Sequence, residues 1–208
     1  MNLARTVRGY VLAGGASSRF GTDKAFAELQ GQTMLVRTAK LLARVTAHVK
    51  IVSPTAKLRA EEYETVADRW PGEGPLGGIL TALADANEQD GEGANALIVS
   101  CDMPFLTAEW LHFVAERALA SGAEAVIPKS SDGWEPLCAA WRGAAAEIIE
   151  PLFEAGTRKI TEALNALRVE VLDEKDWKLF DTNGRLFWNM NTRADYEEAL
   201  RAIAAEKL

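Results

Sequence analysis

The sequence predicts one α/β domain in which a mostly parallel sheet carries helices on both faces. Three observations lead to this fold class. The chain has 208 residues, which suits one large domain because about 150 residues is a nominal domain length. Apolar segments of strand length alternate with segments of helix length, as in βαβ units. No internal repeat and no linker rich in serine, glycine or proline interrupts this alternation.

The first half of the chain alternates expected strands with expected helices. The first strand is a buried apolar run that ends in a glycine-rich turn, and the second is closed by Ser53-Pro54. Thr33 is placed to cap the first helix. Strands are expected at Val7–Leu12, Val49–Val52, Thr65–Val66 and Ala94–Cys101, and helices at Thr33–Thr46, at Ile79–Asn87 and from about Thr107.

The second half is less regular but keeps the same alternation. Strands are expected at Ala125–Ile127, Glu135–Trp141, Val169–Leu172 and Phe187–Asn189, and helices at Ala144–Glu154, Lys159–Leu167 and Thr192–Glu206. Elements of these lengths predict a sheet covered on both faces. Such sheets bind ligands beyond the carboxyl ends of their strands, which here means after Leu12, Val52 and Ser100.

Composition and charge exclude several classes of function. The chain has 23 basic and 30 acidic residues, a net charge of −7, and an acidic surface suits a nucleic-acid backbone poorly. No apolar run approaches the roughly 18 residues of a membrane span, and the start of the chain lacks the apolar region of a signal peptide. We therefore expect no nucleic acid, no membrane contact and a cytoplasmic location. The two cysteines and two histidines lack the spacing of a zinc or redox site, so any metal would be hard and oxygen-liganded, such as Mg²⁺.

A glycine-rich segment with two cations follows the first expected strand, and residues 12–24 read LAGGASSRFGTDK. Glycines let main-chain N–H groups approach phosphates. Arg19 adds a planar fork of donors and Lys24 a mobile point charge. The spacing matches neither a P-loop nor the dinucleotide-binding fingerprint. One interpretation is a phosphate-binding loop, and the other is a glycine-rich surface loop.

Two further segments lie at the ends of later strands. The expected loop Asp68–Gly78 holds four glycines and two prolines, and its tight turns expose main-chain groups that can recognise a base. Asp102, in the sequence Cys-Asp-Met-Pro-Phe, follows the most apolar strand, where a carboxylate can hold a magnesium ion that bridges phosphates. The alternatives are an ordinary flexible loop and an aspartate that caps a turn. Cys101 is interpreted as a small buried residue, since nothing basic is adjacent to it.

A fourth segment, Asn189-Met190-Asn191-Thr192, precedes the last expected helix. In an extended chain Asn189 and Asn191 share one face, where two amides can complete a metal or phosphate shell. Capping of the helix by Asn191 or Thr192 is the competing and compatible interpretation.

In this order and spacing, the four segments resemble the molybdenum cofactor guanylyltransferases. The likeness extends from about Gly9 to about Arg201. Gly14 together with Gly-Pro-Leu-Gly-Gly at residues 74–78 is typical of the guanylyl branch, whereas the cytidylyl branch has Leu-Ala-Ala-Gly and Asp-Gln-Pro. The resemblance implies a single Rossmann-like nucleotidyltransferase domain over residues 1–208, with GTP bound by the part up to about residue 105 and the pterin bound by the rest.

The resemblance also implies the reaction and its residues. GMP is transferred from GTP to molybdopterin, with release of pyrophosphate. Lys24 meets the phosphates, Asp68 lies near the guanine or ribose, and Ser53 stands where the family often has Asn. Mg²⁺ is held by Asp102 and Asn191. The nucleotide-binding residues implied are Leu12, Ala13, Gly14, Gly15, Lys24, Ser53, Asp68, Gly77, Gly78 and Asp102.

On the pterin side, the resemblance implies Pro136, Arg158, Lys159, Asn189 and Asn191. Glu135 precedes Pro136 where some relatives have His. Transient contacts with proteins that deliver molybdopterin or accept the finished cofactor are also implied.

The attacking group in such a reaction is the substrate's own phosphate, which is ionised at neutral pH and needs no protein base. Catalysis would consist of positioning and charge neutralisation by Arg19, Lys24 and the magnesium on Asp102. The alternatives are a cytidylyl or sugar-phosphate nucleotidyltransferase and a module that binds GTP or pterin without catalysis. Lys24, Asp102 and Asn191 argue against the module, because a carrier needs no carboxylate for a metal.

Overall fold

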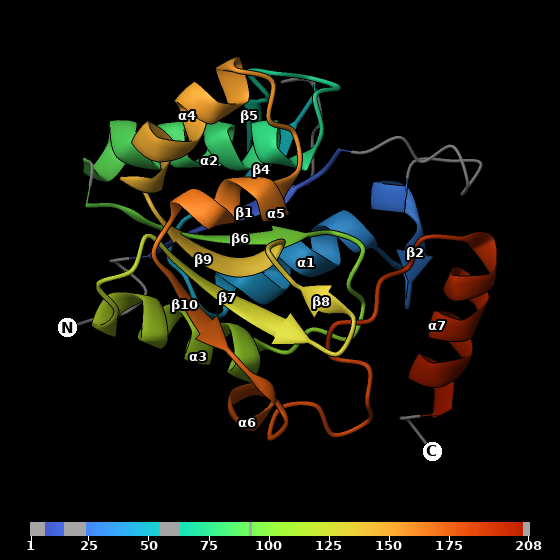
Figure 1. The fold of residues 1–208 in the computed structure, drawn as a ribbon. Helices are drawn as coiled ribbons and strands as arrows, with labels where there is room; N and C mark the ends of the chain where they lie inside the picture. Colours follow the sequence, from blue (N-terminus) through green and yellow to red (C-terminus); the bar gives the residue numbers. More distant parts are fainter. Residues whose placement is uncertain (1–6, 15–23, 55–62, 92, 206–208) are drawn as a thin grey trace.

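The computed structural model describes residues 7–14, 24–54, 63–91 and 93–205, which fold around one central sheet (Figure 1). The strands of this sheet pair in parallel except for the contacts that β9 and the short β8 make with their neighbours. This confirms the predicted mostly parallel sheet. In order of pairing the strands are β10 (Val169–Leu172), β7 (Ala125–Ser130), β9 (Cys138–Arg142), β6 (Asn95–Ser100), β1 (Val7–Leu12), β4 (Val49–Ser53) and β5 (Glu64–Ala67), with β8 (Gly133–Trp134) beside β7.

Helices cover both faces of the sheet, as predicted. Helices α1 (Met34–Ala43) and α3 (Ala108–Ala120) pack on one face. Helices α2 (Pro75–Asp90), α4 (Ala145–Glu154) and α5 (Ile160–Ala163) pack on the other, which is the upper face in Figure 1. No helix in the described part of the chain is long and apolar enough to cross a membrane.

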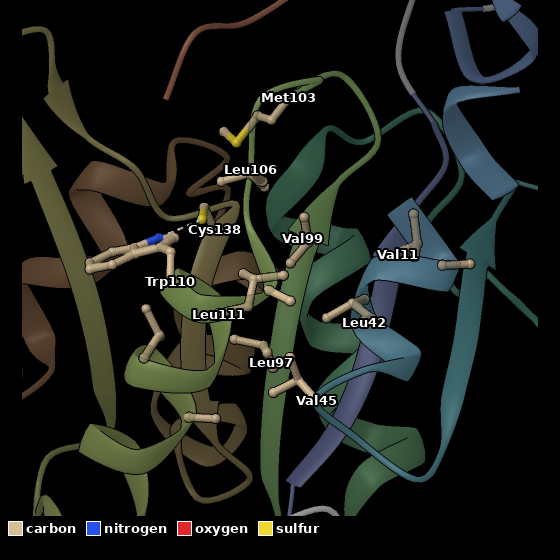
Figure 2. Packing of buried hydrophobic residues seen from close by; sticks show 14 of the residues in the cluster. Val11, Leu42, Val45, Leu97, Val99, Met103, Leu106, Trp110, Leu111 and Cys138 are labelled. Atoms are coloured by element: carbon tan, nitrogen blue, oxygen red, sulfur yellow. Dashed lines mark hydrogen bonds between the residues drawn. The ribbon is translucent and has the colours of Figure 1, made fainter. Parts of the chain in front are cut away.

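Strand β1 (VRGYVL) is apolar except for Arg8 and Gly9 and the Tyr10 hydroxyl, and its place in the sheet explains why. Val7 and Val11 point to the face of α1 and α3, whereas Tyr10 and Leu12 point to the face of α2. Alternate residues of a strand face opposite sides, so a strand covered on both faces buries nearly every side chain. Figure 2 shows part of the core on the α1 and α3 side, where the Trp110 indole N–H donates to Cys138 Sγ at 3.3 Å.

Threonines begin two of these helices at the predicted positions. Thr33 Oγ1 accepts a hydrogen bond from Val36 N at 3.3 Å, and Thr107 Oγ1 accepts one from Trp110 N at 3.2 Å. Each bond satisfies a donor that the first turn of a helix otherwise leaves without a partner.

Helix α2 begins earlier than the sequence predicts and corrects the expected loop Asp68–Gly78. The helix starts at Pro75, so Gly77 and Gly78 are helical and buried. Proline suits the first position of a helix because it has no N–H to satisfy and its φ is already helical. Both glycines argue against a helix by propensity, and close packing explains one of them, because a Cβ at Gly77 would lie 3.2 Å from Trp70 Cβ.

Two expected strands are wrong in whole or in part. Phe187–Asn189 is no strand, because the Phe187 ring packs against Trp110 and Trp177, at 5.6 Å between centroids in each case. The strand expected at Glu135–Trp141 begins only at Cys138, because Cys138 N donates to the Glu135 carbonyl at 3.1 Å and closes a turn.

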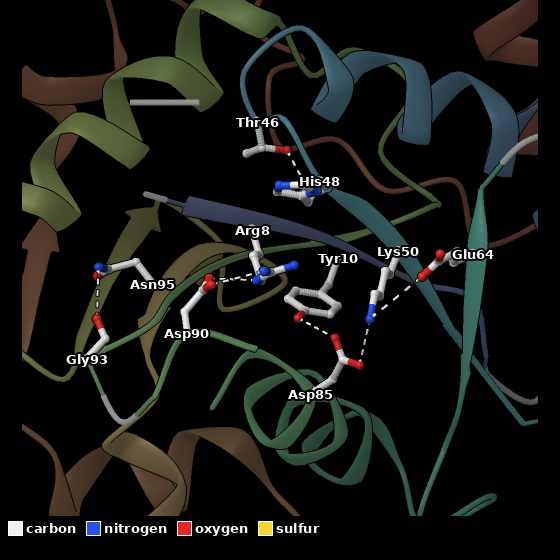
Figure 3. Close-up of polar contacts among 10 residues, drawn as sticks. All are labelled: Arg8, Tyr10, Thr46, His48, Lys50, Glu64, Asp85, Asp90, Gly93 and Asn95. Carbon is white, nitrogen blue, oxygen red and sulfur yellow. Dashed lines mark hydrogen bonds and ion pairs between the residues drawn. The ribbon is translucent and has the colours of Figure 1, made fainter. Parts of the chain in front are cut away.

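A polar network fixes α2 to the sheet (Figure 3). The buried Tyr10 hydroxyl donates to Asp85 Oδ2 at 2.7 Å, and Lys50 Nζ donates to Asp85 Oδ1 at 2.9 Å. Tyr10 lies on β1, Lys50 on β4 and Asp85 on α2. Burial, together with this hydrogen bond, raises the pKa of Tyr10. One carboxylate therefore joins two central strands to the helix whose first turn lies at their carboxyl ends.

A smaller apolar cluster holds the C-terminal helix beside a hairpin that the sequence did not predict (Figure 1). Met190 is fully buried in this cluster, and Tyr196 Oη donates to the Glu28 carbonyl at 2.8 Å. The remaining elements are η2 (Lys24–Phe26), β2 (Glu28–Leu29), β3 (Gln32–Thr33), η3 (Leu164–Ala166), α6 (Glu174–Trp177) and α7 (Arg193–Ala205).

Candidate functional site

A cleft of about 580 Å³ opens at the carboxyl edge of the sheet. Its walls come from the ends of β1, β4 and β6, from the β5–α2 loop and from the first turn of α2. Leu12, Val52 and Ser100, which precede the three places where the sequence predicts ligand binding, all line this cleft. The lining residues are Leu12, Ala13, Gly14, Val52, Pro54, Asp68, Gly72, Gly74, Pro75, Gly78, Ser100 and Leu137.

Gly14 and Gly78 line the cleft with main chain alone. A Cβ at Gly78 would lie 3.4 Å from Leu12 Cδ1, and a Cβ at Gly14 would lie 3.5 Å from the Pro54 ring, which are ordinary van der Waals contacts. Ala13 N donates to the Val52 carbonyl at 2.8 Å, which continues the pairing of β1 with β4 past the end of β1. A flat ligand can therefore lie against main chain at Gly14 and at the start of α2.

The loop that follows β5 is built on Asp68. Its carboxylate accepts hydrogen bonds from Trp70 N and from Thr81 Oγ1, both at 3.0 Å. Asp68 N donates to the Ser53 carbonyl at 2.7 Å. Asp68 thus lines the cleft and also holds the loop to α2 and β4. Ser53 itself is buried and does not line the cleft, whereas its neighbours Val52 and Pro54 do.

 The segment that contains Asp102 and the segment Asn189–Thr192 lie side by side, although Met190 follows Asp102 by 88 positions in the sequence. The Met190 amide donates to the Asp102 carbonyl at 2.8 Å. The fold therefore brings the third and fourth segments of the sequence together, as predicted, at the same edge of the sheet.

Thr192 caps α7, as one of the two interpretations expected. Thr192 Oγ1 accepts from Asp195 N at 3.2 Å, while Asp195 Oδ2 accepts from the main-chain N of Asn191 and of Thr192, both at 2.7 Å. The Asn189 side chain donates to the Phe187 carbonyl at 3.0 Å. That Asn189 and Asn191 share one face stays a prediction.

A second carboxylate faces Asp102. Glu135 is buried, and its Oε1 accepts from Ser130 Oγ at 2.7 Å. Burial raises the pKa of Glu135, the Ser130 hydrogen bond opposes this rise, and the charges of Asp132 and Asp102 add to it. The Oδ1 atom of Asp102 is buried from solvent. Asp102 and Glu135 therefore place two interacting carboxylates close in sequence to Ser100 and Leu137, which line the cleft, although neither carboxylate is among the described lining residues.

The remaining predicted residues lie in several places. The Pro136 carbonyl accepts from the Trp141 indole at 3.2 Å, and its neighbour Leu137 lines the cleft. Lys159 is exposed and pairs with Glu162 at 3.2 Å. Arg158 donates to Glu73, so its guanidinium contacts the loop on the nucleotide side. Gly15 and Arg19 lie outside the described residues, and so does the side chain of Lys24, whose main chain begins η2.

The sequence did not single out Thr81, Leu137 or Glu73. Thr81 is a buried helical residue, and its role follows only from the folding of the loop back onto α2. Leu137 reaches the cleft because Ser100 N donates to its carbonyl at 2.8 Å. No local pattern of residues marks either contact.

Comparison with known proteins identifies the family. A family model described as the MobA-like NTP transferase domain matches residues 9–170. The chain belongs to this family. The cleft therefore occupies the carboxyl edge of an NTP transferase domain.

Relatives of the family extend the likeness over nearly the whole chain. A molybdenum cofactor guanylyltransferase from Desulfosudis oleivorans is 33% identical over 204 residues, which is 97% of this chain and 98% of the relative. A probable molybdenum cofactor guanylyltransferase from Thermococcus gammatolerans is 32% identical over 197 residues, which covers 90% of this chain and 95% of the relative.

Solved structures agree on the fold. Molybdopterin-guanine dinucleotide biosynthesis protein A from Archaeoglobus fulgidus superposes with a TM-score of 0.82 at 27% identity, covering 95% of this chain and 99% of that one. The 2-C-methyl-D-erythritol 4-phosphate cytidylyltransferase from Thermus thermophilus has a TM-score of 0.65 at 14% identity, with coverage of 94% and 98%. At that identity the second likeness concerns the fold alone.

Proposed function

We propose that this protein transfers GMP from GTP to molybdopterin and forms a guanine dinucleotide cofactor and pyrophosphate. One observation carries the proposal: a cleft lined by Leu12–Gly14 and by the first turn of α2 extends to Ser100, two residues before Asp102. Membership of an NTP transferase family and two relatives named as guanylyltransferases support it.

The guanine is proposed to lie against Leu12 and Gly78, which both line the cleft. A Cβ at Gly78 would lie 3.4 Å from Leu12 Cδ1, so these two residues form one wall, and a branched side chain at position 78 would press on Leu12. Main-chain groups at Leu12, Ala13 and Gly14 would pair with the edge of the base. Gly77 does not line the cleft, so its part in nucleotide binding is to let α2 approach Trp70.

The phosphates are proposed to extend from the cleft toward the segment that holds Gly15, Arg19 and Lys24. Asp102 and Asn191 would hold Mg²⁺ there, since both supply oxygen ligands and Mg²⁺ is usually bound by one or two carboxylates together with substrate phosphates. Among the described residues no group of three His, Cys, Asp or Glu side chains forms a complete metal cage, which accords with a metal that relies on substrate oxygens. When bound, such a metal would neutralise charge on the phosphates of GTP.

The second substrate is proposed to approach from the side of residues 136–191, where Pro136, Lys159, Asn189 and Asn191 lie. Residues up to about 105 would then bind mainly the nucleotide and later residues the pterin. Leu137 lies on the border between the two because it lines the nucleotide cleft. Binding of GTP, use of Mg²⁺, transient contacts with delivering or accepting proteins and a cytoplasmic location remain parts of this proposal.

The proposed step needs no protein nucleophile. The terminal phosphate oxygen of molybdopterin forms a bond to the α-phosphorus of GTP, and the bond from that phosphorus to the bridging oxygen of the β-phosphate breaks. Pyrophosphate leaves with the electron pair, so atoms and charge balance without an added acid or base. The protein would contribute alignment of the two phosphates and donors for the growing charge.

Competition binding of GTP, ATP and CTP tests the choice of base. Each buried group left without a partner by the wrong base costs about 1–3 kcal/mol, so two mismatches would favour GTP by about 10²–10⁴ in affinity. Equal affinity for the three nucleotides would overturn the guanylyl assignment, and a preference for CTP would support the cytidylyl alternative.

A further inference from the structure

We propose that Arg158 is a positioning residue that holds the β5–α2 loop in its nucleotide-binding conformation through a contact with Glu73. We call Trp70, Glu73, Phe153 and Arg158 the latch. The inference rests on the proposed function, because it assigns the latch to the affinity of the same cleft for GTP.

The contacts of Arg158 fix its guanidinium in one orientation. Its Nε donates to Glu73 Oε2 at 2.7 Å, and its Nη1 donates to the Phe153 carbonyl at 2.6 Å. The guanidinium carbon lies 3.9 Å from the centroid of the Phe153 ring. An exposed ion pair alone contributes little to stability. Here the Phe153 carbonyl and the Phe153 ring already orient the Arg158 guanidinium that pairs with Glu73.

Glu73 is the point at which the latch reaches the cleft. It lies between Gly72 and Gly74, and both of these glycines line the cleft. Their φ angles of 86° and 88° are in the left-handed region, which glycine enters without strain. Two glycines give this part of the loop unusual freedom, so an attachment at the residue between them restricts both.

Aromatic packing extends the latch to α2. The Trp70 and Phe153 rings lie 5.3 Å apart between centroids. A Cβ at Gly77 would lie 3.2 Å from Trp70 Cβ and 3.5 Å from Phe153 Cζ. In Figure 1 the segment that joins α4 to α5 passes close to the β5–α2 loop, in agreement with the contact between Arg158 and Glu73. The latch therefore joins the far end of α4 to the wall of the cleft.

Loss of the latch should weaken GTP binding without changing the chemistry. If only a fraction of the molecules holds the loop in the binding conformation, the apparent dissociation constant rises by the inverse of that fraction. For Arg158→Ala and for Glu73→Gln we expect the dissociation constant of GTP to rise about 3- to 10-fold on this basis, with little change in kcat. The double variant should bind GTP no more weakly than the single variant with the lower affinity, because both substitutions remove the same contact between Arg158 and Glu73.

The experiment measures GTP binding by calorimetry and, in the nucleotide-free protein, hydrogen exchange of the amides in residues 69–78. Lys178→Gln is the matched control, because Lys178 forms an exposed ion pair of the same 2.7 Å length with Glu174 on α6. We expect faster exchange in both latch variants and wild-type behaviour in the control. Arg158→Lys should be intermediate, because an ammonium keeps the charge but lacks the planar fork.

Three results would contradict the proposal that Arg158 positions the β5–α2 loop through Glu73. Tighter GTP binding by Glu73→Gln would mean that the Glu73 carboxylate acts only by repelling the phosphates of GTP. An increased KM for molybdopterin in Arg158→Ala, with GTP binding unchanged, would return Arg158 to the pterin site. Unchanged hydrogen exchange in both variants would show that the loop does not depend on the contact. A wild-type protein that binds no GTP would instead overturn the proposed function, and hydrogen exchange would still decide whether the contact restrains the loop.

Discussion

Asp85→Ala should destabilise the protein by about 3 kcal/mol, because Asp85 is the acceptor for two otherwise buried donors. Tyr10 is fully buried, and its hydroxyl would lose its acceptor. The Lys50 side chain is 17% exposed and would lose its nearest carboxylate.

The magnitude follows from these two losses. A buried hydroxyl without a partner costs about 1–3 kcal/mol, and a hydrogen bond to a charged group contributes about 1.5–3 kcal/mol. Glu64 lies 3.8 Å from Lys50 Nζ and retains part of the second interaction. The two losses together span about 2.5–6 kcal/mol, and the interaction that Glu64 retains brings the expected value, about 3 kcal/mol, toward the lower end of that range.

Urea unfolding followed by circular dichroism measures the free energy of unfolding. Asp90→Ala is the matched control: Asp90 is also on α2 and pairs with Arg8 at 2.6 Å, but its side chain is 39% exposed. An exposed pair contributes about 1 kcal/mol or less. If Asp85→Ala proves no more destabilising than Asp90→Ala, the view that Asp85 fixes α2 to the sheet is wrong.

Three further predictions concern the core network and the cleft. Burial raises the pKa of Tyr10 above its ordinary value of 10, so Tyr10 ionises in the unfolded chain before it does in the folded protein as the pH rises. The stability that Tyr10 contributes is therefore complete below pH 10 and is lost above it. In urea titrations at alkaline pH, the difference in unfolding free energy between wild type and Tyr10→Phe should shrink. Gly78→Val places side-chain carbon beside Leu12 and should raise the dissociation constant of GTP about 10-fold or more through overpacking. The control Gly122→Val, at a site where a Cβ would meet no atom within 4 Å, should bind GTP normally. Equal GTP binding by the two variants would show that the guanine does not lie at Gly78. Asp102→Asn should fold normally but reduce kcat by about 10² or more, since it removes the charge that a magnesium ion needs, and near-wild-type turnover at saturating GTP and Mg²⁺ would take Asp102 out of the mechanism.

The parts of the fold that follow from local pattern were predictable. Strands β1 and β10 have the bounds that the sequence predicted, because each is a short apolar run closed by polar or turn residues. The caps Thr33 and Thr107 were predictable because a side-chain oxygen at a helix start satisfies a known need. The strand predicted at Phe187–Asn189 was wrong. Aromatic residues are typical of strands, but the Phe187 ring packs against Trp110 from a loop.

The site could be predicted only as far as the edge of the sheet. The rule for parallel sheets placed it after Leu12, Val52 and Ser100, and the cleft is there. The start of α2 was missed because Gly77 and Gly78 disfavour a helix, and the reason for Gly77 is close packing against Trp70, which lies outside the helix. The contact between Glu73 and Arg158 joins positions 85 apart in the chain, and no pattern within one segment reports such a pair.

Transfer of labelled phosphate from GTP tests the central claim most directly. The purified protein is incubated with molybdopterin, Mg²⁺ and GTP labelled either at the α- or at the γ-phosphate, and the products are separated by chromatography. We predict that the α-label appears in a pterin dinucleotide and the γ-label in pyrophosphate, in equal amounts, and that neither forms without molybdopterin. Release of GDP and labelled inorganic phosphate, or no consumption of GTP when both substrates are present, would contradict the proposed guanylyl transfer.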